Sequence, residues 1–173
     1  MGRDKALLDV GGRPLAAVAA AALEGAGATE VFCVGGDLDA LAEHGLAVVA
    51  DRHPGRGPLG GLITALGHGE QDVVVVLSCD LPGAAADAVQ AVVRALDAAP
   101  WADLAVPVHE GRRQLLHAAY RRRTLAHWEA AFAAGERSLH RPAGHLIAVE
   151  VDGLDASWLD DVDEPGDLPG GTG

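Results

Sequence analysis

The sequence predicts an α/β fold in which a doubly wound, mostly parallel sheet lies between two layers of helices. Short runs rich in β-branched residues alternate with longer segments in which Ala and Leu recur at helical spacing. One run, residues 73–77, is apolar at every position, and such a strand needs cover on both faces of its sheet. In these folds the ligand site lies at the carboxyl ends of the strands, so the residues that follow each apolar run are the candidates for function.

Each predicted element is marked by its composition and its flanking residues. Apolar runs bounded by Gly, Pro or Asp are expected to be strands, and they span residues 31–34, 46–50, 73–77, 104–108 and 146–151. Ala-rich segments between them are expected to be helices, and they span residues 14–23, 85–98 and 124–134.

Length and charge limit the domain count and the partners. The 173 residues are interpreted as one domain over 1–168, followed by a flexible tail at 169–173. Asp and Glu number 25 against 13 Lys and Arg, so the formal net charge is −12, which repels nucleic-acid backbones and anionic membranes. Cys33 and Cys79 form no CxxC motif, and no apolar run is long enough for a membrane helix. We therefore expect reduced thiols, a cytoplasmic location, and neither nucleic acid nor membrane as a partner.

Asp80 directly follows the apolar run 73–77, and Pro82 prevents the strand from continuing. A carboxylate at this place suits a hard divalent ion such as Mg²⁺, which takes one or two protein oxygens and otherwise binds water and phosphates. An Asp that caps the next turn or helix gives the same pattern. From these residues alone, both interpretations stay open.

A glycine-rich segment at residues 51–61 follows another predicted strand and precedes an apolar helical run. Glycines let the backbone approach a ligand closely, and the amides that open a helix favour an anion. The segment matches neither the GxxxxGK[ST] phosphate loop nor the GxGxxG dinucleotide fingerprint. It is therefore a candidate ligand loop or simply a tight connection.

Three charged segments have both a functional and a solvated interpretation. Arg3 and Lys5 could neutralise a polyphosphate, although basic residues near a terminus are usually solvated. The arginines at 112–113 and 121–123 could receive an anionic substrate, or belong to a solvated turn. The acidic segment 160–168 is expected to be solvated, unless it folds back beside Asp80, where one of its carboxylates could complete or tune a metal site.

Taken together, segments in every part of the chain resemble the molybdenum cofactor guanylyltransferases, within the wider group of NTP-transferase-like α/β domains. They are MGRDKALL at 1–8, GGRPL at 11–15, VADRHPGRGPLGGL at 49–62, LSCDLP at 77–82, GRRQLLHAAYRR at 111–122, AGERSL at 134–139 and DVDEPGDL at 161–168. The first segment and GPLGG are shared with related nucleotidyltransferases, whereas CDLP and the HAAY segment are narrower. The resemblance implies a three-layer, Rossmann-like nucleotidyltransferase domain.

That resemblance implies an enzyme that transfers GMP from GTP to the terminal phosphate of molybdopterin, releasing pyrophosphate, with Mg²⁺ as cofactor. It implies that Lys5 contacts the nucleotide phosphates and that Asp51 contacts the nucleotide. It implies that Asp80 holds Mg²⁺ near the triphosphate and that Lys5 and Asp80 serve catalysis. Transient contact with molybdoenzyme maturation proteins is a further implication.

Further site residues are carried over from the same resemblance. The nucleotide-binding loop would include Gly57, Pro58, Leu59 and Gly60. Asp163 would be a second metal ligand beside Asp80. Asp161 and Asp163 stand where the family often has the asparagines of an NxNTPEDL-like segment, so they depart from its pattern.

The chemistry of such a transfer explains why the sequence shows no motif for a side-chain nucleophile. A phosphate oxygen attacks the α-phosphorus, and positioning with charge stabilisation by Lys5 and a metal on Asp80 would supply most of the acceleration. No side-chain nucleophile is needed, and no histidines have the i, i+4 spacing of a zinc site. We expect packing or loop roles for His53 and His117.

The chain also departs from the family at its beginning. The family has an apolar strand and a glycine-rich LAGGxxxR loop ahead of the segment that opens this sequence. We interpret the written chain as clipped, and expect it to bind GTP poorly and to be unstable, with apolar strand edges exposed.

Alternative functions keep the fold but change the chemistry. Cytidylyl transfer to molybdopterin, or nucleotidyl transfer to a sugar phosphate or another small phosphate, would differ in base or acceptor. A non-catalytic nucleotide- or pterin-binding protein would bind without turnover, and replacing Asp80 would distinguish it from an enzyme.

Overall fold

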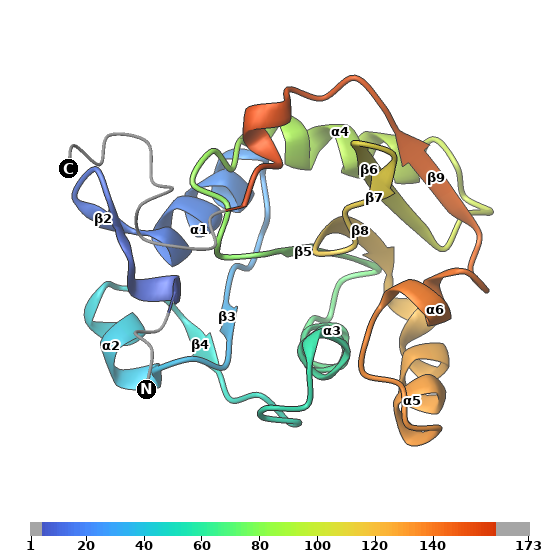
Figure 1. The fold of residues 1–173 in the computed structure, drawn as a ribbon, viewed down its shortest axis with the longest axis horizontal. Helices are drawn as coiled ribbons and strands as arrows, with labels where there is room; N and C mark the ends of the chain where they lie inside the picture. Colours follow the sequence, from blue (N-terminus) through green and yellow to red (C-terminus); the bar gives the residue numbers. More distant parts are fainter. Residues whose placement is uncertain (1–4, 162–173) are drawn as a thin grey trace.

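Helices and strands alternate along the chain in the computed structural model, which describes residues 5–161 (Figure 1). The helices are α1 (Leu15–Gly25), α2 (Leu38–Glu43), α3 (Pro58–His68), α4 (Ala86–Asp97), α5 (Leu125–Ala133) and α6 (His140–Ala143), with 3-10 turns at Lys5–Leu7, Arg122–Thr124 and Ala156–Trp158. The strands are β1 (Asp9–Val10), β2 (Arg13–Pro14), β3 (Cys33–Val34), β4 (Val48–Val49), β5 (Val73–Leu77), β6 (Leu104–His109), β7 (Arg112–Arg113), β8 (His117–Arg121) and β9 (Ala148–Val151). The expected tail at 169–173 lies outside the described residues.

The main sheet has the order β5-β8-β6-β7, with β9 paired to β6. β5 and β6 each pair antiparallel with β8 and so run in the same direction, and β9 runs parallel to β6. A parallel crossover needs a dozen or more residues, and only residues 110–116 separate β6 from β8, so β8 must run antiparallel. The predicted α/β architecture is confirmed, and its sheet is mixed.

Helices cover both faces of the main sheet (Figure 1). On one face α3 and α5 pack against the apolar cluster around Tyr120 and Trp128, while on the other α4 packs against Ala119. The indole of Trp128 is fully buried, donates a hydrogen bond to Thr124 Oγ1 at 3.1 Å, and meets the Tyr120 ring edge to face. The all-apolar strand β5 is therefore sandwiched, as its sequence predicts.

Each of the five predicted strands is present, but β8 and α2 are not among the predicted elements. The segment of β8 reads HAAYR and has no β-branched residue, so its propensity does not mark it as a strand. It becomes one because it pairs with β5 along one edge and with β6 along the other. The short helix α2 begins where the Asp37 carboxylate accepts a hydrogen bond from the Ala40 amide at 3.1 Å, the local capping pattern of a helix start.

β3 and β4 form a separate two-stranded parallel sheet. Within the part of the chain that the structure describes, β3 pairs only with β4 and β5 only with β8. A largely apolar cavity of about 560 Å³ is lined by β3 and β5 together with residues of α1 and α3. The side chains of β5 are consequently only partly buried, although all of them are apolar.

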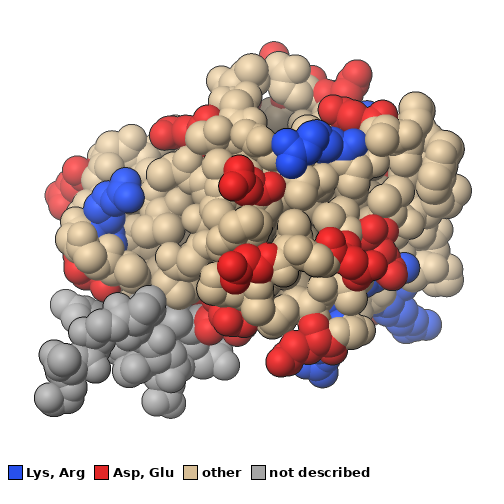
Figure 2. All heavy atoms as spheres, turned by 90° about the horizontal axis from the view of Figure 1, so that it is seen from above, with Lys and Arg blue, Asp and Glu red and all other residues tan. Residues whose placement is uncertain are grey.

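Acidic side chains are scattered over the face shown in Figure 2 and do not gather into one patch. No helix within residues 5–161 combines the length and the hydrophobicity required to cross a membrane.

Candidate functional site

A polar cavity of about 840 Å³ lies where β5 ends and β8 begins. Its charged and ionisable lining residues are Asp80, His109, Glu110, Arg112, Arg113, His117, His140, Asp160 and Asp161. Both signs of charge are present, so the cavity suits a ligand with a metal-bound or anionic part. It opens at the sheet edge predicted for the site.

Asp80 is placed in this cavity by the turn that follows β5. The turn is attached to the sheet because the Ser78 amide donates to the Leu116 carbonyl at 2.7 Å. Asp80 is half-buried, and no hydrogen bond or ion pair engages its carboxylate within residues 5–161. Its oxygens are thus available to a ligand or cation that enters the cavity.

The end of the described chain also reaches the cavity. Asp161 lines it and is exposed, and the neighbouring Asp160 carboxylate lies 3.1 Å from the His109 ring. Asp163, the predicted second metal ligand, lies outside the described residues. Among residues 5–161, no three His, Cys, Asp or Glu side chains are gathered closely enough to hold a metal ion.

Asp51 lies two residues after the end of β4 and organises the glycine-rich loop. Its Oδ1 accepts hydrogen bonds from the His53 amide and from the Thr64 hydroxyl, both at 2.9 Å. Thr64 is fully buried in α3, and its oxygen also accepts from the Arg52 amide at 3.1 Å. The carboxylate is therefore held in a fixed place beside α3, with its second oxygen outside these bonds.

The start of α3 is packed more tightly than a free anion-binding helix end would be. Pro58 has no amide proton, the Leu59 amide donates to the Arg137 carbonyl at 3.2 Å, and the Gly60 amide donates to the Gly57 carbonyl at 3.1 Å. Gly57 has φ +83°, a conformation that favours glycine, and a Cβ there would lie 3.0 Å from the Arg137 oxygen. The amides of Leu59 and Gly60 are therefore already hydrogen-bonded within the protein, so they are not free to bind an anion at the start of α3.

Arg137, in the AGERSL segment, thus supports the glycine-rich loop from a distant part of the chain. Its guanidinium lies over the Phe132 ring at 4.1 Å and donates to the Phe132 carbonyl at 2.9 Å. The His53 ring also packs against Phe132, with ring centroids 4.3 Å apart. The packing role expected for His53 is confirmed.

Lys5 begins the 3-10 turn Lys5–Leu7, which packs beside α1. It is half-buried and is not among the residues that line the polar cavity. The structure therefore brings Asp80 and Asp161 to one cavity, and Asp51 and Gly57 to one loop. The nucleotide and metal roles of all these residues remain predictions.

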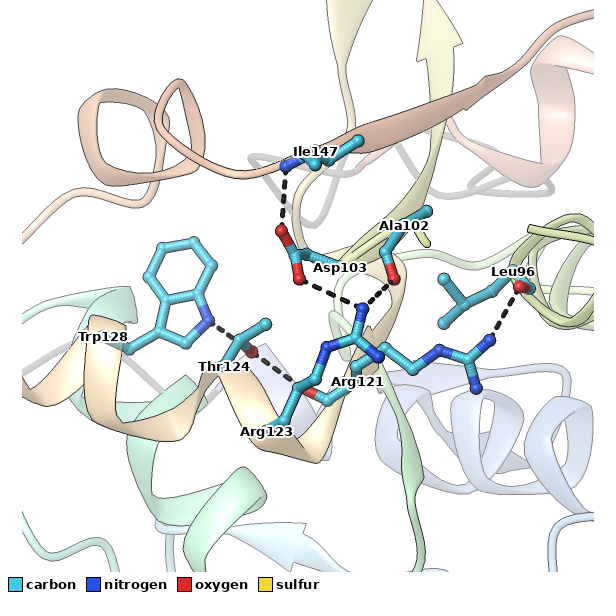
Figure 3. A network of polar contacts seen from close by, with 8 residues as sticks. All are labelled: Leu96, Ala102, Asp103, Arg121, Arg123, Thr124, Trp128 and Ile147. Carbon is cyan, nitrogen blue, oxygen red and sulfur yellow. Dashed lines mark hydrogen bonds and ion pairs between the residues drawn. The ribbon is translucent and has the colours of Figure 1, made fainter. Parts of the chain in front are cut away.

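The two arginine segments lie at opposite ends of β8 and make different contacts. Arg112 and Arg113 line the polar cavity, where Arg113 pairs with Glu150 at 2.7 Å. At the opposite end of β8, Arg121 donates to the Leu96 carbonyl at 2.9 Å and Arg123 donates to the Ala102 carbonyl at 2.7 Å (Figure 3). The second segment is structural, so the interpretation of a phosphate-binding role applies only to the first.

Two residues that line the polar cavity, at or just before the start of β8, have no ligand role predicted from the sequence, which indicates only a packing or loop role for His117. Gln114 and His117 line it because an antiparallel strand presents its first residues at the edge where parallel strands end. A search of the positions after apolar runs cannot find them. The spacing between 104–108 and 117–121 is too short for a parallel crossover, but it becomes a signal only once 117–121 is known to be a strand.

The layered α/β fold is that of a nucleotidyltransferase-like domain. Two solved structures share this fold. One is the molybdopterin-guanine dinucleotide biosynthesis protein A from Archaeoglobus fulgidus, at 21% identity and a TM-score of 0.66, covering 86% of this chain and 74% of that one. The other is the 2-C-methyl-D-erythritol 4-phosphate cytidylyltransferase from Thermus thermophilus, at 21% identity and a TM-score of 0.70, covering 95% of this chain and 90% of that one.

The chain belongs to the family of MobA-like NTP transferase domains, whose sequence model matches residues 1–149. It is 36% identical over 115 residues to a protein of Chloroflexus aggregans named probable molybdenum cofactor guanylyltransferase, covering 64% of this chain and 53% of that protein. It is 39% identical over 103 residues to a molybdenum cofactor guanylyltransferase of a Shewanella species, covering 57% and 50%. The chain spans about half the length of these curated relatives.

Proposed function

We propose that the protein is a nucleotidyltransferase that moves GMP from GTP to the terminal phosphate of molybdopterin and releases pyrophosphate. The observation that carries the proposal is the placement of Asp80 after the carboxyl end of the apolar strand β5, in a polar cavity that Arg112 and Arg113 also line. The family and the names of its curated relatives support the choice of substrates.

The reaction forms one bond and breaks one. An oxygen of the acceptor phosphate bonds to the α-phosphorus of GTP, and the bond from that phosphorus to the oxygen bridging to the β-phosphate breaks, so pyrophosphate leaves with that oxygen. In this scheme Arg112 binds the acceptor phosphate and orients it for in-line attack. Lys5 would contact the departing phosphates, and Asp51 would hold the nucleotide beside the loop that it organises.

The donor set at Asp80 fits Mg²⁺. This ion takes one or two protein carboxylates and fills its other positions with water and phosphate oxygens, so a single half-buried carboxylate in a roomy polar cavity is sufficient. When bound, Mg²⁺ would neutralise charge that develops on the leaving pyrophosphate. Asp80 would hold it, and Asp161 lines the same cavity.

The test incubates the purified full-length protein with Mg²⁺, molybdopterin and each of the four common NTPs, and measures the pyrophosphate released. We expect release with GTP, and loss of at least about a hundredfold in rate for Asp80→Asn, on the scale of losing one electrostatic stabiliser. Asp97→Asn is the matched control because Asp97 is exposed at the end of α4, and it should leave the rate unchanged. Preference for CTP would assign a different base, and equal rates for Asp80→Asn and wild type would refute the role of Asp80.

A further inference from the structure

His117 is fully buried, and neither of its ring nitrogens has a hydrogen-bond partner within the described chain, residues 5–161. Burial lowers the pKa of its imidazole from 6.5 to about 4, so the ring is neutral at pH 7. A neutral imidazole has one N–H donor and one acceptor nitrogen. Unpaired buried polar groups destabilise a fold, and this ring keeps a donor and an acceptor that residues 5–161 do not use.

The sheet brings this ring to the site. His117 is the first residue of β8 and pairs with Leu77, the last residue of β5, so it lies beside the turn that carries Asp80. Alternation along β8 places it on the same face as Ala119, which packs against α4. Unlike Ala119, His117 also lines the polar cavity.

The cavity therefore offers two kinds of recognition. Arg112 is exposed and makes no ion pair with residues 5–161, so its guanidinium suits a phosphate. His117 is buried where a charge is disfavoured, so it suits a neutral group such as a ring amide, a ring nitrogen or a hydroxyl. A ligand that satisfies both has an anionic end and a neutral, hydrogen-bonding end.

Building on the proposed function, we infer that His117 is a specificity-determining residue for the acceptor. Its imidazole hydrogen-bonds a neutral polar group on the heterocyclic part of the acceptor, while Arg112 binds the acceptor phosphate. The nucleotide makes no use of His117. An acceptor that lacks such a group, for example a simple sugar phosphate without a nitrogen heterocycle, leaves the ring unpaired and is bound more weakly.

The test replaces the imidazole by an apolar side chain of similar size, in the full chain. For His117→Leu we expect Tm without ligand to rise by about 2 to 8 °C, because an unpaired buried polar group is removed. We expect the Kd for molybdopterin, measured by equilibrium dialysis, to rise about 5- to 30-fold, and the Kd for GTP to stay constant. His117→Gln, which restores a donor and an acceptor, should recover part of the molybdopterin affinity.

His127→Leu is the matched control. His127 lies outside the cavity lining, and its Nε2 is 3.0 Å from the Pro142 carbonyl oxygen, so this variant should lower Tm and leave both Kd values unchanged.

A molybdopterin Kd that is unchanged in His117→Leu overturns the inference. A lower Tm for His117→Leu also overturns it, because it would show that the ring stabilises the fold. Wild-type binding of molybdopterin without transfer refutes the proposed function alone, and the Kd comparison still decides the role of His117. Absence of wild-type binding overturns both.

Discussion

Two adjacent glycines near the start of α3 provide a matched test of the loop geometry. A Cβ at Gly60 would lie 2.8 Å from the Cβ of His53 and 3.2 Å from its carbonyl oxygen, whereas a Cβ at Gly61 would meet no atom within 4 Å. Carbon atoms normally pack at about 3.5 to 4.0 Å, so Gly60→Ala must displace the loop that carries His53. Gly61→Ala has no such effect.

Both variants gain about 0.5 to 1 kcal/mol of stability, because alanine loses less conformational entropy than glycine when it enters a helix. Only Gly60→Ala adds the overpacking penalty, about 1 to 3 kcal/mol. The difference in unfolding free energy between the two variants therefore isolates the clash, and should be about 1 to 3 kcal/mol in favour of Gly61→Ala. For a chain of this size that difference corresponds to about 2 to 12 °C in Tm.

Thermal unfolding followed by circular dichroism measures this difference in stability. Titration with GTP measures the effect of each variant on nucleotide binding. Because Asp51 accepts from the His53 amide, movement of His53 should disturb the carboxylate, so Gly60→Ala is expected to bind GTP several-fold more weakly than Gly61→Ala. If Gly60→Ala proves at least as stable as Gly61→Ala, the close approach of α3 to His53 is wrong, and with it the account of how Asp51 is positioned.

Further predictions concern the buried polar groups and the arginines. Thr64→Val removes the hydroxyl that bonds Asp51 and should lower the unfolding free energy by about 1 to 3 kcal/mol in urea denaturation; an unchanged midpoint would argue against the network. His117 takes up a proton more readily in the unfolded chain, so wild-type stability should fall between pH 6.5 and about 4 by about 3 kcal/mol more than that of His117→Leu, and parallel pH profiles would refute the buried neutral ring. Arg112→Ala should raise KM for the acceptor without changing Tm, whereas Arg123→Ala should lower Tm and leave KM unchanged; the reverse pattern would contradict their assignment.

The sequence predicts that Asp80 follows the end of a strand, and the structure places it there, because that prediction depends on one local pattern. An all-apolar run predicts a sandwiched strand, and the residue that follows it lies at the functional edge of the sheet. The same rule could not find His117, because it assumes parallel strands, and β8 runs the other way. The direction of β8 follows from the short connection between β6 and β8. This length can be interpreted only after both segments have been recognised as strands.

Long-range contacts explain the other differences. Nothing in the spacing of the glycine-rich loop predicts that the Leu59 amide is taken by the Arg137 carbonyl, which comes from a segment beyond α5. Likewise, Arg112 and Arg123 belong to similar arginine-rich segments, yet one lines a cavity and the other is bonded to the Ala102 carbonyl. Composition identifies such residues as candidates, but packing decides their use.

The central claim is transfer of the nucleotidyl group to an acceptor, and the position of the α-phosphate tests it most directly. With Mg²⁺, molybdopterin and GTP labelled in its α-phosphate, the account predicts label in a molybdopterin–guanosine product joined through two phosphates, and unlabelled pyrophosphate in equal amount. Label found only in free GMP, or remaining entirely in GTP, would contradict it.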